Sequence, residues 1–151
     1  MFLLALDLRK GFDSVAPDRL LWALKRYGVR EDMLSAIKEI YTDRVFTVAG
    51  GGRESELKRQ RAGISQGCPI SPFLFGMLIS MLMSDVQSSL NDDANAACVK
   101  GDLEDILYAD DTLLISRRCP HSEEHMASVE QKGADHGLRI HWAECTSYLF
   151  A

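Results

Sequence analysis

The stretch Tyr108-Ala109-Asp110-Asp111 constrains this 151-residue chain more than any other segment. Apolar runs lie on both sides of it, from Leu103 to Leu107 and from Thr112 to Ser116, and two such runs joined by a short polar link are typical of a β-hairpin. Because Asp tolerates the backbone angles of tight turns, turn formation alone could explain the acidic pair. A chemical role needs a third carboxylate, since two neighbouring divalent cations require several anionic oxygens.

Asp7 is the candidate for that third carboxylate. It follows the continuous apolar run from Phe2 to Leu6, which is typical of a strand buried on both faces. Such a strand would bring Asp7 to an edge of the sheet that solvent or a ligand can reach. An acid that simply ends a strand explains the same pattern, so the first run alone does not decide between the two interpretations.

The remaining segments predict helices, short strands and one further hairpin. Helices are expected at Pro17–Tyr27, Arg30–Thr42, Phe73 to about Leu90, and about His121 to His136, with Gly28 and Gly137 as end signals. Strands are expected at Arg44–Ala49, Ser55–Lys58, Ala96–Val99, Leu138–Trp142 and Ser147–Phe150, with a turn at Gly50–Gly52. In the helix after Pro72, small residues recur at every fourth position and predict close packing, most simply against the sheet: Gly76, Ser80 and Ser84.

Charge, cysteines and hydropathy narrow the class of protein. The formal net charge is -5, the wrong sign for a protein that binds nucleic acid alone through phosphate contacts. The cysteines are widely spaced and form no CxxC pair, so neither a disulfide framework nor a zinc ribbon is expected. No apolar run reaches the roughly 20 residues of a membrane span, and the apolar start is too short for a signal peptide. We expect an intracellular protein that is not secreted and has no membrane partner, with the nucleus among the open compartments.

Two local patterns allow more than one interpretation. Arg53, Lys58, Arg59 and Arg61 form a basic patch in an acidic chain, which could meet phosphates or could be a solvated hairpin edge. The loop at residues 61–72 contains two glycines and two prolines and leads into a helix N-terminus, where backbone N–H groups attract anions. A simple helix-entry loop remains the alternative.

A third pattern concerns zinc. His121 and His125 are four residues apart with Cys119 nearby, a spacing that one helix face could use to bind this metal. No second ligand pair follows at a suitable spacing. Exposed histidines on a polar helix are therefore the preferred interpretation.

Three segments together resemble the palm motifs of reverse transcriptases of the non-LTR retrotransposon, or LINE, and group II intron kind. Residues 6–14 read Leu-Asp-Leu-Arg-Lys-Gly-Phe-Asp-Ser and resemble the first motif, Gly63–Phe75 the second, and the YADD sequence Tyr108–Asp111 the third. The order and separations make this signal far more specific than any single motif. The resemblance covers nearly all of the chain and implies that residues 1–151 are a palm domain without the fingers and thumb.

The implied fold is α+β, a small antiparallel sheet that carries Asp7 beside the acidic hairpin and has helices on its other face, as in ferredoxin-like or RRM-like cores. The implied activity is RNA-directed DNA polymerisation, a nucleotidyltransferase reaction on an RNA template, a DNA primer and deoxynucleoside triphosphates. Asp7, Asp110 and Asp111 would be catalytic and would hold two Mg²⁺ ions, for which Mn²⁺ could substitute, and Leu8 would add a backbone carbonyl.

The resemblance also implies nucleotide and nucleic-acid contacts. Phe12 would close the space that a ribose 2′-hydroxyl needs and so favour deoxynucleotides by steric exclusion. Gln66 would bond the incoming nucleotide, and Gly67 would allow its close approach. Three further residues are expected to contact nucleic acid: Arg59, Arg61 and Tyr108.

The fourth motif departs from the family pattern, Gly-Leu-x-x-Asn followed shortly by Lys. This chain has His141 at the Asn position and Glu144 at the position that aligns with the Lys. If that Lys protonates the departing pyrophosphate, an acid loses the proton donor and adds negative charge near a polyanion. We therefore expect impaired catalysis, as in a fragment or a decaying copy of a retroelement.

Two other classes of function stay open. A non-catalytic RNA-binding or scaffold remnant could keep the same fold, although no exposed aromatic pair is expected on a strand. A nucleotide cyclase shares the palm architecture and a metal-binding acidic hairpin, but the loop in Gly63–Phe75 fits a polymerase better.

Overall fold

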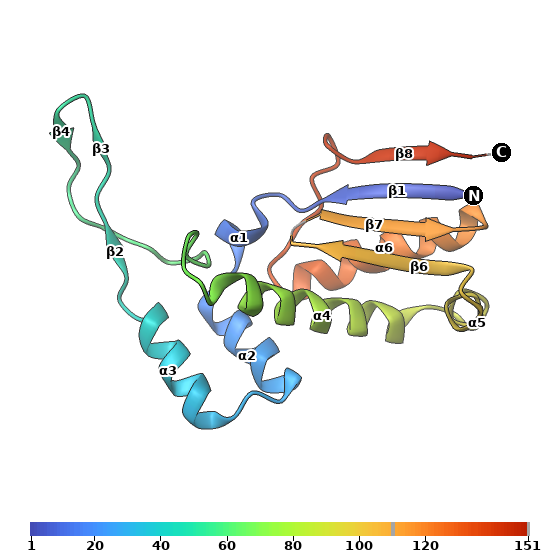
Figure 1. Ribbon diagram of the computed structural model, residues 1–151, viewed down its shortest axis with the longest axis horizontal. Helices are drawn as coiled ribbons and strands as arrows, with labels where there is room; N and C mark the ends of the chain where they lie inside the picture. Colours follow the sequence, from blue (N-terminus) through green and yellow to red (C-terminus); the bar gives the residue numbers. More distant parts are fainter. Residues whose placement is uncertain (110, 151) are drawn as a thin grey trace.

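A computed structural model describes residues 1–109 and 111–150. An antiparallel sheet lies beside a layer of helices, and an arm of short strands extends away from both (Figure 1). The sheet has the order β6-β7-β1-β8, with bounds β1 Phe2–Asp7, β6 Leu103–Tyr108, β7 Asp111–Ser116 and β8 Thr146–Leu149. The helices are α1 Gly11–Ser14, α2 Pro17–Tyr27, α3 Glu31–Tyr41, α4 Ser71–Ser89, α5 Asp92–Lys100 and α6 Cys119–Asp135. The expected α+β class with an antiparallel sheet is confirmed.

The sheet has one buried face and one open face. Leu6 of β1 pairs with Thr112 of β7, and both are buried under the helices. Because side chains alternate along a strand, the flanking Asp7–Asp111 pair points to the other face. The helix-covered face and the open face that carries the two aspartates are therefore fixed by the same strand register.

Helix α4 is the central helix, packed between α2 and α6. Its buried side chains recur with helical spacing: Leu74, Phe75, Leu78, Ile79, Leu82 and Val86. The strip of small residues predicted to pack closely lies on the exposed side instead, so that prediction is wrong: Gly76, Ser80 and Ser84. Burying leucines removes far more apolar surface from water than burying glycine or serine, and the larger side chains determine which side faces the core.

The segment after α4 folds differently from the prediction. Ala96–Val99, expected as a strand, lies within α5. The Asn91 side chain caps this helix by accepting a hydrogen bond from the Ala94 N–H at 2.9 Å, and Gly101 ends it with φ 73°. The Asn91 cap and the Gly101 end signal therefore mark the start and the end of a helix.

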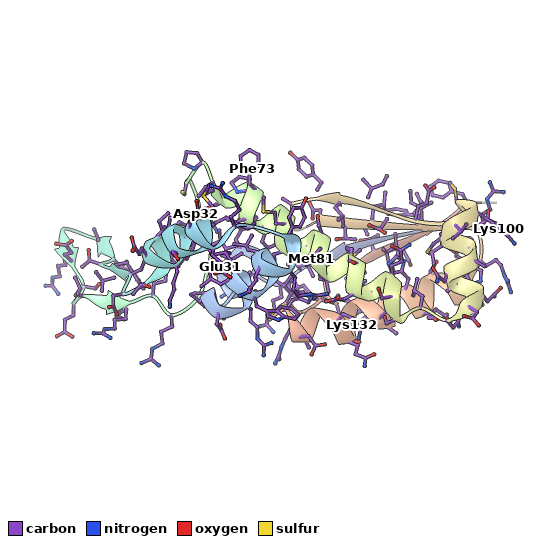
Figure 2. All side chains as sticks on the ribbon, turned by 90° about the horizontal axis from the view of Figure 1, so that it is seen from below. Glu31, Asp32, Phe73, Met81, Lys100 and Lys132 are labelled. Carbon is purple, nitrogen blue, oxygen red and sulfur yellow. The ribbon has the colours of Figure 1, made fainter. Side chains whose placement is uncertain are left out.

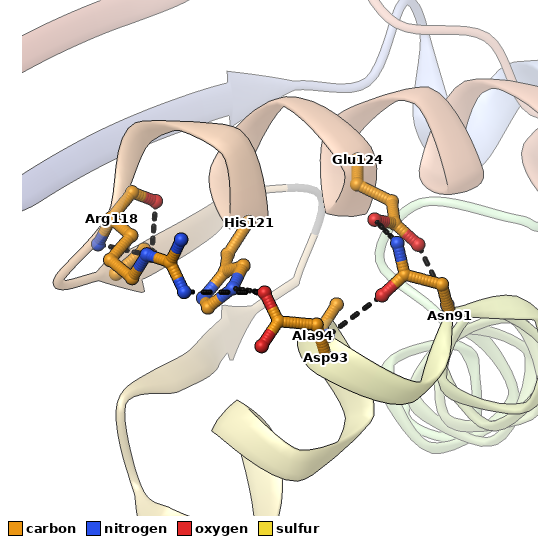
Figure 3. A network of polar contacts seen from close by, with 7 residues as sticks. Asn91, Asp93, Ala94, Arg118, His121 and Glu124 are labelled. Carbon is orange, nitrogen blue, oxygen red and sulfur yellow. Dashed lines mark hydrogen bonds and ion pairs between the residues drawn. The ribbon is translucent and has the colours of Figure 1, made fainter.

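Polar contacts hold α5 against α6, as Figure 3 shows. His121 Nε2 lies 2.9 Å from Asp93 Oδ2, and Glu124 accepts a hydrogen bond from the Asn91 N–H at 2.7 Å. His121 and His125 are buried, which corrects the expectation that they are exposed, and burial lowers the pKa of His125. Within the described residues, neither histidine belongs to a group of ligand atoms close enough to hold a metal ion.

The arm contains β2 Val45–Phe46, β3 Ala49–Gly50, β4 Arg53–Glu54 and β5 Lys58–Arg59. It forms the predicted hairpin, but as two short antiparallel pairs instead of two continuous strands. Gly51 and Gly52 form the turn with φ 60° and 76°, angles that glycine adopts without strain. Figure 2 shows the arm at the end of the molecule opposite Lys100, and Phe73 projecting outward from the start of α4.

Two details complete the fold. The segment Leu138–Trp142, predicted as a strand, forms only an isolated antiparallel bridge between Ile140 and Leu8. In the described part of the chain, no helix combines the length and apolar character that crossing a bilayer requires.

We predict that Asp85 makes stability depend on acidic pH. Its carboxylate accepts hydrogen bonds from Arg26 at 2.6 Å and lies 2.8 Å from His136 Nε2. The Arg26 hydrogen bond, aided by His136, lowers the pKa of Asp85 to about 2 from 3.8. Because the folded-state pKa is the lower one, the stabilisation is complete above about pH 4 and is lost as pH falls towards about 2.

Asp85→Asn should therefore lower the free energy of unfolding by about 1–2 kcal/mol at neutral pH. Denaturant titrations at several pH values should show a shallower acid-side loss of stability in the variant. The matched control is Asp135→Asn, because Asp135 is exposed and lines the same surface pocket as Asp85 and Arg26. Equal pH dependence of wild type and Asp85→Asn would contradict the prediction.

Candidate active site

Strand pairing brings two predicted site residues together. Asp7 ends β1, Asp111 begins β7, and the two are directly opposite in the antiparallel register. Tyr108, the last residue of β6, is opposite Asp111 on the other side. Directly opposed residues place their Cβ atoms about 4.5–5.5 Å apart on one face, so these three side chains share the open face of the sheet. Asp110 lies outside the described residues.

The two aspartates line one pocket of about 200 Å³. Glu144 contributes a third carboxylate to the same pocket, and Ala5, Ile106 and Leu113 form apolar walls. The Asp7 side chain is 26% exposed, so solvent reaches its oxygens. Three carboxylates around a small open cavity are oxygen donors of the kind that hard divalent cations prefer.

The site is continued by residues 141–145, which loop out opposite the end of β1. The antiparallel pairing stops at Ala5–Thr146 and resumes at the Leu8–Ile140 bridge. Between these points the His141 N–H donates to the Asp7 carbonyl at 2.8 Å. The bulged segment thereby carries His141 and Glu144 to the Asp7 side chain.

His141 connects the carboxylates. Its Nδ1 lies 3.2 Å from Asp7 Oδ2 and 3.2 Å from Glu144 Oε1. Sequence comparison identified His141 and Glu144 only as departures from a motif, and their contact with Asp7 was missed. The contact depends on the bulge, which periodicity does not reveal.

The loop before α4 is bound to α1 through its backbone. The Ile64 N–H donates to the Phe12 carbonyl at 2.7 Å, and the Gly63 N–H donates to the Val15 carbonyl at 2.8 Å. Gln66 Nε2 donates to Asp13 Oδ1 at 3.2 Å. These bonds join the first and second predicted motifs into one surface.

Phe12 occupies the junction between the motifs. Its ring stacks on Phe75 of α4 with centroids 4.3 Å apart and an interplanar angle of 17°. It also lines a pocket of about 380 Å³ together with Tyr108 and Gly76. Phe12 is therefore held from behind and presents its free side to a cavity beside the acidic hairpin.

Turn formation does not account for Asp111, because this residue lies in β7. The positive φ in the described part of the hairpin falls on Ala109, at 54°. A left-handed conformation costs a non-glycine residue roughly 1–2 kcal/mol. The strained residue in the described part of the hairpin is therefore Ala109, beside the acidic site, and its methyl side chain cannot relieve the strain with a hydrogen bond.

A second, basic pocket lies around the segment that follows β1 and was missed from the sequence. Arg9, Lys10 and Arg139 line a cavity of about 280 Å³ with Asp13, Ser14 and Gly137. The Arg9 N–H donates to the Arg139 carbonyl at 2.8 Å, which aligns the two segments. Arg9 and Lys10 lie two and three residues after Asp7 and were a visible signal, whereas Arg139 joins them only through the bridge between Leu8 and Ile140.

The other predicted residues lie elsewhere. Arg59 lies on the arm, with its Nη1 3.8 Å from Asp43 Oδ1. Arg61 is exposed at the start of the loop that precedes α4. Gly67 is exposed in that loop with φ 83°. The Leu8 carbonyl accepts a hydrogen bond from the Gly11 N–H at 3.1 Å, which leaves one of its two lone pairs available.

An antiparallel sheet with opposed aspartates on its open face and helices on the other defines an α+β domain with an acidic, metal-suited site. The chain belongs to the reverse transcriptase (RNA-dependent DNA polymerase) family, which matches residues 1–149. Membership of this family implies a fold that binds nucleic acid and the use of a divalent metal ion.

Relatives come from non-LTR retrotransposons. The chain is 28% identical over 145 residues to the Retrovirus-related Pol polyprotein from type-1 retrotransposable element R2 of Popillia japonica, covering 95% of this chain and 23% of that protein. It is 26% identical over 155 residues to the RNA-directed DNA polymerase from mobile element jockey of Drosophila melanogaster, covering 97% and 16%. The chain thus spans less than a quarter of these relatives.

Solved telomerase structures share the fold. The apo telomerase from Candida Tropicalis matches with a TM-score of 0.74 and 13% identity, over 97% of this chain and 28% of that one. A telomerase from Candida albicans in complex with a TWJ fragment of telomeric RNA matches with a TM-score of 0.69 and 13% identity, over 98% and 27%. At this identity the likeness concerns the fold alone.

We predict that Gly63→Ala destabilises the protein by about 1–3 kcal/mol. Gly63 has φ 100°, and an added Cβ would lie 3.2 Å from the Asp13 carbonyl oxygen. The control is Gly76→Ala, since an added Cβ at Gly76 meets nothing within 4 Å and the residue lies within α4. This control should stabilise the protein by about 0.5–1 kcal/mol through helix propensity. Thermal or denaturant unfolding measures both changes, and equal stability of the two variants would contradict the proposed tight loop contact.

Proposed function

We propose that this chain is the palm portion of an RNA-directed DNA polymerase that adds deoxynucleotides to a primer 3′-hydroxyl by two-metal phosphoryl transfer. The observation that carries the proposal is the register of Asp7 opposite Asp111 on the open face of the sheet, in a chain of the reverse transcriptase family. The proposed partners are an RNA template, a DNA primer and deoxynucleoside triphosphates.

The residues present fit Mg²⁺. Asp7 and Asp111 offer carboxylate oxygens in one pocket, and the Leu8 carbonyl adjoins Asp7 in the chain; oxygen donors of this kind suit a hard cation. We assign Asp110 to the same role from its sequence position. Two bound Mg²⁺ ions would neutralise phosphate charge and make the primer hydroxyl easier to deprotonate.

The protein itself would position the nucleotide. Phe12, fixed by its stack on Phe75, would lie under the sugar and exclude a 2′-hydroxyl. Gln66 would exchange its hydrogen bond with Asp13 for one to the nucleotide. Gly67, with open space around its α-carbon, would let the nucleotide approach the backbone, and Tyr108, 79% exposed, would contact nucleic acid.

The basic pocket would hold the triphosphate. Arg9, Lys10 and Arg139 line one cavity and supply its positive charge, and Arg side chains bind phosphate oxygens in a bidentate manner. This local charge offsets the acidic balance of the chain at the point where a polyanion would bind. Arg59 and Arg61 would contact nucleic acid on the arm side.

The proposed activity is impaired by residues 141–144. Glu144 lines the acidic pocket where a lysine would supply a proton to the leaving pyrophosphate. A carboxylate there repels the product and donates no proton at neutral pH. Slow nucleotide addition is therefore expected from this chain.

The alternative is a non-catalytic RNA-binding remnant of the same fold. One observation favours it. Tyr148 lies on β8 and Phe150 directly follows that strand, and they are 53% and 48% exposed. The Phe150 N–H donates to the Met1 carbonyl at 2.9 Å, so the chain stays extended just beyond β8. Residues two apart on an extended segment share a face, and base stacking is open to these two exposed rings, although only Tyr148 lies on the strand itself.

We predict that Asp111→Asn abolishes metal-dependent addition of a single deoxynucleotide. The assay uses the full 151-residue chain, a DNA primer annealed to RNA, and Mg²⁺ or Mn²⁺. Removing a metal-binding carboxylate should lower the rate at least about 100-fold. The control, Asp105→Asn, changes an exposed acid on the same hairpin that lies outside the pocket of Asp7 and should retain the rate.

Addition that is insensitive to Asp111→Asn would count against the polymerase proposal. RNA binding with no nucleotide addition, weakened by Tyr148→Ala, would favour the remnant instead.

We also predict that Phe12→Ala relaxes the choice of sugar. Without the ring, the space for a 2′-hydroxyl opens, and the use of ribonucleotides relative to deoxynucleotides should rise by about 10–100-fold. Single-nucleotide addition with dTTP and UTP measures the ratio. An unchanged ratio, at a measurable dTTP rate, would remove Phe12 from the discriminating role.

A further inference from the structure

We propose that Asp7, His141 and Glu144 form a zinc-binding site. Among the described residues, their potential ligand atoms all lie within 4.8 Å of one another. The site uses one imidazole nitrogen and two carboxylates, so it differs from the oxygen-only set proposed for Mg²⁺. Two of its three ligands, His141 and Glu144, are the residues at which this chain departs from the fourth motif.

The two separations that involve His141 match those between ligands of a single ion. His141 Nδ1 lies 3.2 Å from Asp7 Oδ2 and 3.2 Å from Glu144 Oε1. Ligand atoms about 2.1 Å from one zinc ion lie about 3.4 Å apart at tetrahedral angles and about 3.0 Å apart at octahedral angles. Both distances fall between these values, and the third separation, between the Asp7 and Glu144 oxygens, is no more than 4.8 Å.

Hydrogen bonding alone explains this geometry less well. A charged N–H to carboxylate bond is typically about 2.7–2.9 Å long, and Nδ1 carries at most one proton. Here the same nitrogen faces two carboxylate oxygens at equal, longer distances. A metal ion is attracted by all three atoms at once.

The donor types select the metal. Imidazole is a common ligand of Zn²⁺ and other transition metals, while Mg²⁺ prefers oxygen ligands and keeps much of its water. One histidine with two carboxylates, in a pocket open to solvent, leaves room for a fourth ligand such as water. The site therefore favours Zn²⁺ over Mg²⁺.

The backbone holds two of the ligands in place. The His141 N–H donates to the Asp7 carbonyl at 2.8 Å, and the Glu144 N–H donates to the His141 carbonyl at 2.9 Å. Both bonds fix the bulged segment independently of the side chains. The Glu144 side chain is 64% exposed, so an ion reaches the site directly from solvent.

Zinc binding would have a consequence for catalysis, which rests on the proposed function. Asp7 belongs to both donor sets, so Zn²⁺ bound by His141 and Glu144 would compete with Mg²⁺ for this carboxylate. Zinc should then inhibit nucleotide addition. The binding itself does not depend on that activity.

The test titrates Co²⁺, a spectroscopic substitute for Zn²⁺, into the metal-free full chain and follows the visible absorption of the bound ion, then displaces it with Zn²⁺. We expect one bound Co²⁺ per chain, displaced by Zn²⁺. His141→Asn should weaken Co²⁺ binding at least about 100-fold, and Glu144→Gln about 10–100-fold. Circular dichroism verifies folding, and the exposed Glu144 makes Glu144→Gln informative even if His141→Asn is unstable.

Two control variants test whether the ion binds at His141 and whether its binding is independent of nucleotide addition. His121→Gln tests the other histidine-containing segment and should leave Co²⁺ binding unchanged. Asp111→Asn should also keep Co²⁺ binding while losing nucleotide addition, so failure of the polymerase proposal is distinguishable from failure of the zinc site. The proposal would be overturned if the wild-type chain showed no Co²⁺ absorption. It would also be overturned if His121→Gln lost the absorption while His141→Asn and Glu144→Gln kept it.

Discussion

The antiparallel pairing of β1 with β7 determines which side chains face the helices and which reach the site. Leu6 opposite Thr112 is buried, and this burial fixes the register. A slip of one residue would turn Asp7 towards the helices, where an unpaired carboxylate is costly to bury. The free energy of packing α4 and α6 therefore also holds Asp7 and Asp111 together on the open face.

The other parts of the site are attached to this strand pair through backbone hydrogen bonds. The loop before α4 is bonded to Phe12 and Val15 of the segment after β1, and residues 139 and 141 are bonded to Arg9 and Asp7 on its other side. Side chains at the surface can change while these main-chain contacts persist. A chain that keeps the fold can therefore still change the chemistry of the site, as His141 and Glu144 do here.

Strong local signals were sufficient for much of this structure. The apolar runs beside the acidic hairpin became β6 and β7, and the helix at Pro17–Tyr27 has the predicted bounds. Predictions failed where partners distant in sequence decide the outcome. His121 is buried because Asp93 reaches it from α5, and Leu138–Trp142 is no strand because the chain bulges opposite Asp7. The helix α5 was missed despite local signals, since Ala96–Val99 was interpreted as a strand and the cap Asn91 and the end signal Gly101 were not recognised.

The negative charge of the site follows from one residue, because Glu144 stands where the family pattern has a lysine. At the position of Glu144, a lysine would place a positive charge beside Asp7, whereas the glutamate adds a third carboxylate to the pocket. Like charges at this range repel and raise the demand for a cation. Arg9 and Arg139 do not meet this demand, because they line a separate pocket that contains Asp13 and not the one that contains Asp7 and Glu144. The imidazole of His141 lies between Asp7 and Glu144, where a metal ion that accepts nitrogen as a ligand would balance the excess negative charge of the two carboxylates.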